Sequence, residues 1–397
     1  MRKNRLFRAS VFAIFLTLCL LPGIAHAQVT VSCPPTTGGT YTSITAALNA
    51  VGQIGPLTFT VTGTCNENVS VFNARSLRFI AGAGGAKIVA PQDSNAFDIF
   101  RSQFIRLVNL EIAGVPGSTP GSAGSGVFIT QASNVQINGC EIHDHGAGVF
   151  AINASLLFLN NTNIHNNNPS DGLHVTGNST ANVSGSTIQN NGSPGVLNWG
   201  NPASVSGGVG VFVAVNSHVS FGQDNLIQNN ADVGIVARLL STVVFVTSGA
   251  GITIQGHNLD GILVQQGGHL QVNGPALIQG NGGGCPPQAP IACGGIFGTG
   301  NATVELAGVG TISGNQGAGI FVEQGTNLHL NGATISNNSG DGVHVRWIST
   351  ADFRDFGGGA NTITGNGGAS VFCDARSLAI GNLGGLSNVK CGQNAQQ

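Results

Sequence analysis

Apolar and polar residues recur along this chain at a spacing that is most often 22 to 24 residues. A phrase of isoleucine, two polar or small residues and then asparagine or histidine occurs nine times, with its isoleucines at Ile142, Ile164, Ile188, Ile227, Ile254, Ile278, Ile312, Ile335 and Ile363. Most copies are followed by a marker glycine and two aliphatic residues flanking one other, as in GVFIT from Gly126. This period, built from short strands and Asn/Gly corners, is typical of a solenoid with stacked rungs.

The two positions that flank the middle residue after the marker glycine are mostly aliphatic. The first reads Val127, Val149, Leu173, Val211, Ile235, Ile262, Ile296, Ile320 and Val343. Because side chains alternate along a strand, both positions share one face, which must be the interior. About three short parallel strands per coil predict a parallel β-helix, right-handed by the preference of parallel crossovers.

The asparagines of the first phrase form a column with a structural explanation. The column reads Asn167, Asn191, Asn230, Asn281, Asn315, Asn338 and Asn366, with His145 and His257 at the same place. Asparagine tolerates the left-handed backbone of a tight corner, and stacked amides can bond from rung to rung. The column therefore indicates a corner ladder rather than a reactive site.

Both ends of a solenoid need covers, because bare strand edges recruit other chains. Residues 42–51 are predicted to form a short amphipathic helix, capped by Ser43 or Thr42, over the first rung. The predicted fold is all-β, a single-domain right-handed parallel β-helix over residues 28–397. It includes an N-terminal cap at about residues 28–60 and a C-terminal cap at about 373–397.

Residues 1–27 have the pattern of a cleavable signal peptide: a basic start, an apolar run and the small-residue site Ala25-His26-Ala27. Without them, ten basic residues face sixteen acidic ones. This balance argues against nucleic acid as a partner, since phosphate binding needs a basic surface. We expect a secreted or periplasmic protein without a transmembrane anchor, whose oligomeric state the sequence leaves open.

Seven cysteines remain after the signal, and export permits disulfides. We predict the pairs Cys33–Cys65, Cys285–Cys293 and Cys373–Cys391, which tie the N-terminal segment, a Pro-rich insertion and the C-terminal tail. Cys140 is left over and shares the strand side of inward Ile142. A buried, inert thiol is its expected role.

The repeats, the N-terminal helix and the stretch TFTVTGTCNENVSV at residues 58–71 resemble the right-handed β-helix proteins of the pectate lyase-like superfamily. The resemblance covers nearly the whole mature chain. It implies the fold but not an activity, because the superfamily includes lyases, hydrolases, esterases, epimerases and adhesins.

The middle residue after each marker glycine faces outward and is often aromatic. With Trp199 on a neighbouring insertion, the candidate substrate-binding residues are Phe128, Phe150, His174, Trp199, Phe212, Phe297, Phe321 and His344. One interpretation is a set of strand residues partly covered by loops. The other is an apolar track for a glycan or a protein. The three largest insertions, residues 113–125, 192–209 and 282–294, fall at one corner beside this aromatic stripe.

The acids do not match a known catalytic arrangement. Asp171, Asp260 and Asp341 precede marker glycines, where polygalacturonase-like enzymes hold catalytic aspartates, but adjacent rungs lack partners and the Gly-His-Gly motif of those enzymes is absent. Asp232 and Asp260 are the best remaining pair, although a solvated corner explains them more simply. No cofactor is implied, and no catalytic residue is assigned.

His143 and His165 share an outward column on adjacent rungs, with Glu141 on the same side. A metal can be held by such donors, but an exposed polar ladder continued by Gln189 and Gln228 is the simpler interpretation. We therefore assign no metal site.

The outward aromatic residues and the neighbouring insertions favour recognition of a polysaccharide or cell-envelope surface through the aromatic stripe. One alternative is a polysaccharide lyase or glycoside hydrolase with an atypical site. Another is a structural or adhesin-like module that uses the stripe against protein.

Overall fold

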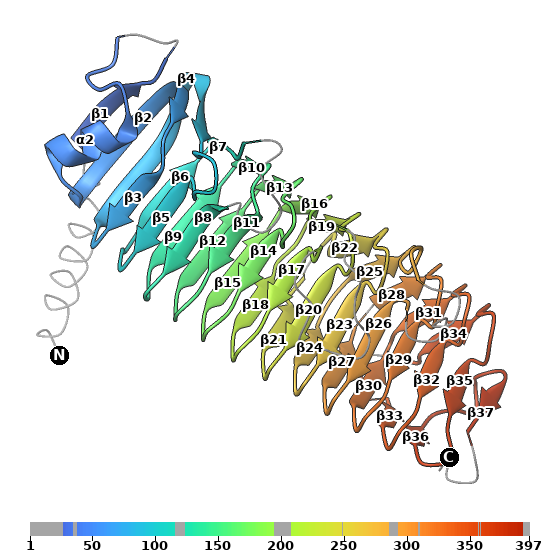
Figure 1. The fold of residues 1–397 in the computed structure, drawn as a ribbon. Coiled ribbons are helices and arrows are strands. Elements are labelled where there is room, and N and C mark those ends of the chain that lie inside the picture. Colours follow the sequence, from blue (N-terminus) through green and yellow to red (C-terminus); the bar gives the residue numbers. More distant parts are fainter. Residues whose placement is uncertain are drawn as a thin grey trace, which may run out of the picture.

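The computed structural model describes residues 27–34, 38–115, 124–193, 208–247, 249–285, 293–308, 310–355, 357 and 359–391. The chain winds into an elongated stack of rungs, with the N-terminal helix at one end and β37 at the other (Figure 1). All pairings between strands are parallel. The signal-peptide prediction lies almost wholly outside the described residues.

Each regular rung contributes three strands, one to each face of the stack, as predicted. The first face is a 13-stranded sheet of β3 (Val69–Phe72), β5 (Phe97–Phe100), β8 (Ser125–Thr130), β11 (Ala147–Ala151), β14 (Leu173–Val175), β17 (Val211–Val213), β20 (Ile235–Arg238), β23 (Ile262–Gln265), β26 (Ile296–Thr299), β29 (Ile320–Val322), β32 (Val343–Val345), β35 (Val371–Cys373) and β37 (Val389–Lys390).

The second and third faces are joined into one sheet near the N-terminus by two long strands, β2 (Ile54–Asn66) and β4 (Arg75–Val89), and β1 (Ala27–Ser32) pairs with β2. The second face continues with β6 (Ile105–Val108), β9 (Asn134–Asn138), β12 (Leu156–Asn160), β15 (Thr180–Ser184), β18 (His218–Phe221), β21 (Thr242–Phe245), β24 (His269–Val272), β27 (Thr303–Ala307), β30 (Asn327–Asn331), β33 (Thr350–Phe353) and β36 (Leu378–Gly381). The third face has β7 (Glu111–Ala113), β10 (Glu141–His143), β13 (Asn163–His165), β16 (Thr187–Gln189), β19 (Asn225–Gln228), β22 (Ile252–Gln255), β25 (Ala276–Gln279), β28 (Gly310–Ser313), β31 (Thr334–Ser336) and β34 (Thr362–Thr364).

The core is a continuous column of aliphatic side chains between the three faces. Every isoleucine of the repeated phrase is at most 3% exposed, from Ile142 to Ile363. The marker position requires glycine for a steric reason. A Cβ on Gly172 would lie 2.8 Å from the Gly210 carbonyl oxygen on the next rung. Rungs can therefore close to hydrogen-bonding distance only where this side chain is missing.

The asparagine column is a buried ladder of amides. Asn167 donates from Nδ2 to Oδ1 of Asn191 at 2.9 Å, and Asn191 donates in the same way to Asn230. The predicted ladder is confirmed, but the left-handed backbone belongs to the preceding residue, as in Asn166 and Asn190 with φ of 56° and 53°. The buried side-chain amide donates to a backbone carbonyl group at the strand end, as Asn167 does to Ile142. The preceding residue is exposed at the corner and does not share this role.

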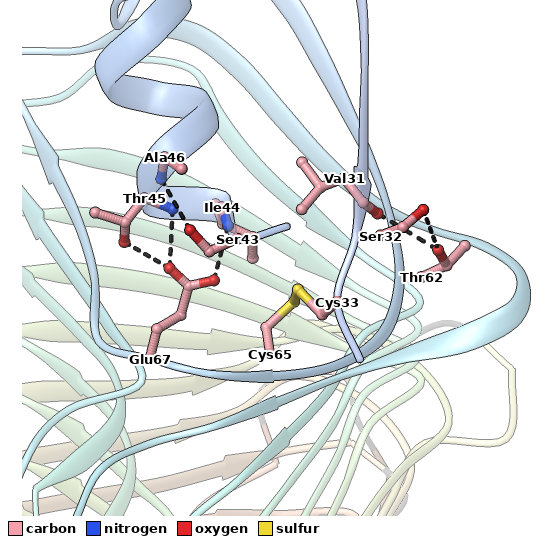
Figure 2. Close-up of a disulfide and its surroundings, with 10 residues drawn as sticks. All are labelled: Val31, Ser32, Cys33, Ser43, Ile44, Thr45, Ala46, Thr62, Cys65 and Glu67. Atoms are coloured by element: carbon pink, nitrogen blue, oxygen red, sulfur yellow. Dashed lines mark hydrogen bonds between the residues drawn. A yellow bond between two sulfur atoms is a disulfide. The ribbon is translucent and has the colours of Figure 1, made fainter. Parts of the chain in front are cut away.

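The N-terminal end is covered by α2 (Ile44–Val51), in agreement with the predicted helix, and Ser43 is its cap. The Ser43 hydroxyl accepts from the Ala46 N–H, while the Glu67 carboxylate accepts from the N–H groups of Ile44 and Thr45 at 2.7 and 2.9 Å (Figure 2). A distant acid thus supplies the negative charge that a helix N-terminus favours.

All three predicted disulfides are present, linking Cys33 with Cys65, Cys285 with Cys293, and Cys373 with Cys391. Cys140 is unpaired and buried, as predicted. Burial raises the pKa of the Cys140 thiol to about 11, which keeps it protonated and unreactive.

Histidine at two corner positions predicts a pH-dependent stability. Burial lowers the pKa of His257 from 6.5 to about 4, so the unfolded chain binds more protons between these pH values. The free energy of unfolding should then fall by up to about 3 kcal/mol as pH drops from 6.5 to 4 on account of this group. In the variant His257→Asn, which restores the usual corner residue, urea unfolding should show a smaller loss. A difference from the wild type that is constant across this pH range would contradict the assignment.

Candidate functional site

The predicted aromatic stripe forms one outward column on the first face. Parallel register places Phe128, Phe150, His174 and Phe212 on successive rungs. Farther along, Phe297, Phe321 and His344 align in the same way, after the aliphatic positions Val236 and Leu263. Trp199 lies outside the described residues.

The second half of this column is buried, which favours the interpretation of covered strand residues there. Phe212 and Phe297 are each 7% exposed, and Phe321 is 2% exposed. They form a second apolar cluster with corner residues of neighbouring rungs, namely Val209, Val233, Leu259, Cys293 and Ala318. His344 is also buried, whereas Phe128, Phe150 and His174 are half-buried.

The rings of the stripe pack mainly against one another. The centroids of Phe150 and His174 are 4.2 Å apart with nearly parallel planes, and those of His344 and Phe372 are 4.5 Å apart. Each histidine is also bonded through Nδ1 to an aspartate three residues earlier, at 2.8 Å for His174 and 2.7 Å for His344. Where a ring face contacts a neighbouring ring, it cannot stack on a sugar, which favours a structural role for these parts of the stripe.

The best carboxylate pair of the sequence is also buried, not solvated. Asp232 is 4% exposed and Asp260 is 2% exposed. Asp260 accepts a hydrogen bond from the Gly294 N–H at 2.9 Å, and burial raises its pKa well above the ordinary value. This carboxyl group anchors the segment that carries Cys293, and it cannot reach a bound polymer.

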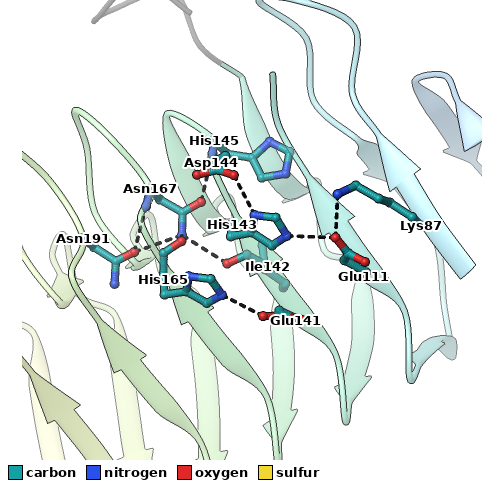
Figure 3. Close-up of polar contacts among 10 residues, drawn as sticks. All are labelled: Lys87, Glu111, Glu141, Ile142, His143, Asp144, His145, His165, Asn167 and Asn191. Atoms are coloured by element: carbon teal, nitrogen blue, oxygen red, sulfur yellow. Dashed lines mark hydrogen bonds and ion pairs between the residues drawn. The ribbon is translucent and has the colours of Figure 1, made fainter. Parts of the chain in front are cut away.

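The densest group of ionisable side chains lies on the third face, over β4, β7, β10 and β13 (Figure 3). Lys87 Nζ contacts Glu111 Oε1 at 2.6 Å, and the same oxygen lies 3.2 Å from His143 Nε2. On its other side, His143 Nδ1 lies 2.8 Å from Asp144 Oδ2. Its imidazole is therefore held between two carboxylates.

The second histidine of this ionisable cluster stacks on the first. The ring centroids of His143 and His165 are 5.1 Å apart, and His165 Nε2 lies 3.0 Å from Glu141 Oε1. The acids remain accessible, with 53% of the Glu141 side chain exposed. Burial alone would raise the pKa of Glu111, but hydrogen bonds from Lys87 and His143 outweigh it and hold that pKa below 4.5.

The cluster does not gather metal ligands closely enough in this structure. Within the described residues, the one group of three donor side chains whose ligand atoms lie within 4.8 Å of one another is Cys33, Cys65 and Glu67. Both of those cysteines are in a disulfide, and Glu67 caps α2. The donor geometry of the described chain thus gives no reason to add a metal to the site.

A ladder of glutamines continues from the cluster along the third face. Gln228 Nε2 donates to Gln189 Oε1 at 2.8 Å, Gln255 to Gln228 at 3.0 Å, and Gln279 to Gln255 at 2.9 Å. The last three, with Gly256, Gly280, Gly314, Asn229 and Ser313, line an open groove of about 430 Å³. The amides are half-buried, so one edge of each faces this groove.

Sequence analysis identified His143, His165, Glu141 and the first two glutamines of this face but missed Lys87, Glu111 and Asp144. Glu111-Ile112 pairs in register with Glu141-Ile142, so the repeated Glu-Ile pair was the signal for one more rung. Lys87 lies beyond an irregularity in the pairing of β2 with β4, and the repeat does not predict its register.

No helix among the described residues is long and apolar enough to span a membrane. A model of the family described as "Right handed beta helix region" matches residues 80–285. This match confirms the predicted handedness. A search of curated protein sequences finds no match.

Two solved structures share the fold. The A-module of the mannuronan C-5 epimerase AlgE6 from Azotobacter vinelandii aligns at a TM-score of 0.56 and 15% identity, covering 83% of this chain and 93% of that one. The A-module of AlgE4 from the same organism aligns at 0.55 and 15% identity, covering 82% and 90%.

Burial of the stripe predicts that its second half stabilises the fold. Phe321→Ala should lower the free energy of unfolding by about 3 kcal/mol, because it empties a packed cluster. The control Phe72→Ala truncates a ring on the same face that is 50% exposed, and it should cost under about 1 kcal/mol. Equal small losses in urea unfolding would mean that the Phe321 ring is not packed.

Proposed function

Because the chain belongs to the family of right-handed β-helix proteins, we propose that it binds a polysaccharide along the third face. The ligand would lie over the glutamine ladder, with one end at the ionisable cluster of Lys87, Glu111, Glu141, His143 and His165. The observation that carries this proposal is the open groove lined by three of the stacked glutamines.

The ladder leaves hydrogen-bonding capacity for a ligand. A primary amide has two N–H donors and two acceptor lone pairs. Within the ladder, a glutamine such as Gln228 donates one N–H to the preceding glutamine and accepts one hydrogen bond from the next. Each middle rung therefore offers one donor and one acceptor at intervals of about 4.8 Å. This spacing is comparable to the length of one sugar unit, which suits a repeating polymer of hydroxyl groups.

Similar solved structures give this proposal a context. The two epimerase modules with this fold act, by their names, on mannuronan. Identity of 15% transfers the fold alone, so the polysaccharide proposal depends on the groove and its amides.

Binding to the aromatic stripe stays a prediction for the half-buried residues Phe128, Phe150 and His174. Burial opposes it for Phe212, Phe297, Phe321 and His344. We therefore assign the third face, rather than the stripe, as the principal ligand surface.

A polysaccharide lyase or glycoside hydrolase is the second candidate. It is favoured by the gathering of ionisable side chains around His143, whose ring lies between Glu111 and Asp144, but both ring nitrogens are bonded to those carboxylates. Hydrolysis of a glycoside also needs a protonated carboxyl group, and Glu111 is held ionised. The cluster thus supports binding more strongly than hydrolysis.

We further infer that the protein works outside the cytoplasm. Three disulfides support this location, because such bonds persist in oxidising compartments. A cleavable signal over residues 1–27 would direct the export.

Gln255→Ala is the test of the proposed face, since Gln255 bonds to both neighbours in the ladder and lines the groove. On a glycan array, the wild type should bind at least one polysaccharide, and Gln255→Ala should weaken that binding about tenfold through loss of ladder and ligand hydrogen bonds. Product detection on the same polymers would reveal cleavage, if any occurs.

Gln271→Ala is the matched control, because Gln271 points outward from β24 on the second face. It should bind as the wild type does. Absence of any glycan binding by the wild type, or equal binding by Gln255→Ala, would refute the proposal. Loss of binding in Phe150→Ala alone would return the ligand to the stripe.

A further inference from the structure

The groove of the third face coincides with glycine at three successive corners. The corner residue before the buried amide ladder is asparagine on several rungs, as at Asn190 and Asn337. On the three successive rungs of the groove it is glycine, at Gly256, Gly280 and Gly314. All three glycines are exposed. The groove therefore lies where the stack lacks the side chain that the corner carries on those other rungs.

Packing within the protein does not require two of these glycines. A Cβ on Gly280 or Gly314 would meet no atom of the described chain within 4 Å, in contrast to the marker glycine Gly172. The left-handed backbone does not require them either, because asparagine adopts it readily. At Asn337 φ is 56°, close to 61° at Gly280 and 63° at Gly314. The space at these two corners is thus open to a ligand.

The groove is straight because its lining repeats from rung to rung. Strands β19, β22, β25 and β28 pair in parallel register, which sets one lining residue of each strand in a single column (Figure 1). The corner residue that follows on each rung forms a second column beside it. Three rung intervals of about 4.8 Å give a track roughly 14 Å long, enough for about three or four sugar units of an extended chain. A chain that coils would leave this track after the first contacts.

The lining offers hydrogen-bond donors together with acceptors. It consists of amide side chains, one hydroxyl group and glycine backbone. Gln255 donates one N–H to Gln228 and accepts one from Gln279, which leaves it one donor and one acceptor. A sugar hydroxyl group can pair with both, because it donates and accepts. A carboxylate only accepts, so over this lining it would leave amide carbonyl groups unpaired and lose its hydration without an opposite charge.

We propose that the groove selects an extended, uncharged polysaccharide, whose chain lies over the glycine corners parallel to the stack. This inference rests on the proposed function and adds the chemical class of the ligand. Gly280 and Gly314 determine specificity by leaving room for the chain, and the glutamines bond to its hydroxyl groups. Polymers of uronic acids fall outside this class, as do chains that coil into helices.

An array of three kinds of chain tests this selection: extended uncharged chains (mannan, xylan and cello-oligosaccharides), the coiled chain amylose, and the polyuronate mannuronan. Mannan and mannuronan differ in charge, while cello-oligosaccharides and amylose are both glucose chains that differ in shape. The wild type should bind at least one extended uncharged chain about tenfold or more tightly than amylose and mannuronan. Added salt should leave this affinity unchanged, because no charges are paired.

Gly280→Asn and Gly314→Asn place the usual corner residue in the groove. Each should weaken binding about tenfold or more, because the new side chain occupies the space of the ligand. Urea unfolding should show that both variants keep the fold. Gly365→Asn is the matched control, since it makes the same change at the same corner two rungs beyond the groove. It should bind as the wild type does.

Chain length gives a test that needs no variant. With oligomers of the polymer that binds best, the affinity should rise from two sugar units to about four, the length of the track. A disaccharide that binds as tightly as the tetrasaccharide would overturn the extended track.

The outcomes separate this inference from the proposed function. Tightest binding to mannuronan or amylose overturns the selection and leaves polysaccharide binding intact. Weak binding by Gln255→Ala with full binding by both glycine variants moves the chain off the corners and overturns this inference alone. Absence of binding to every chain on the array overturns the proposed function as well.

Discussion

Rung-to-rung pairing is the constraint on which the rest of this structure depends. Every strand of the stack must meet the next in parallel register, so the backbone of each rung has to close to hydrogen-bonding distance at its corners as well as along its strands. The marker glycines permit the close approach, and the buried asparagine amides satisfy the backbone groups that the corners leave over. Interior positions are therefore fixed, and function is left to the outward columns.

The outward columns of the first and third faces differ in how their side chains pack. On the first face, aromatic rings stack on one another and half of the column is covered by corner residues, which adds a second apolar core. On the third face, amides bond along the stack but keep an open edge. The same rung spacing thus builds a packed surface where side chains contact each other and a surface with spare hydrogen-bonding groups where amides keep an open edge.

The fold could be predicted from the sequence because its signals are local and repeated. Ile188, Val211 and Asn191 each recur at fixed offsets, and their columns gave the strands, the interior and the ladder. The three disulfides could be predicted because each pair of cysteines ties one segment outside the regular repeat: the N-terminal segment, the Pro-rich insertion or the C-terminal tail. The corner geometry was assigned one residue too late, because the pattern alone does not distinguish Asn190, which has the left-handed backbone, from Asn191, which is buried.

The candidate site was less predictable for two reasons. An outward column can be identified from alternation, but whether Phe321 is covered depends on corner residues such as Ala318, whose packing no period reports. The charge cluster joins rungs that begin before the regular repeat. The repeated Glu-Ile pair could have placed Glu111, but no repeat places Lys87 beside it. Long-range register within irregular rungs is set by tertiary packing, which a single sequence does not display.

We propose that the third face, and not the aromatic stripe, holds the ligand. Crystals of the protein soaked with an oligosaccharide of a polymer that it binds on the glycan array would test this most directly. We expect sugar density along Gln228, Gln255 and Gln279, with its end beside the ionisable cluster. Sugar rings stacked on Phe128 or Phe150 of the first face, with an empty glutamine groove, would contradict the claim.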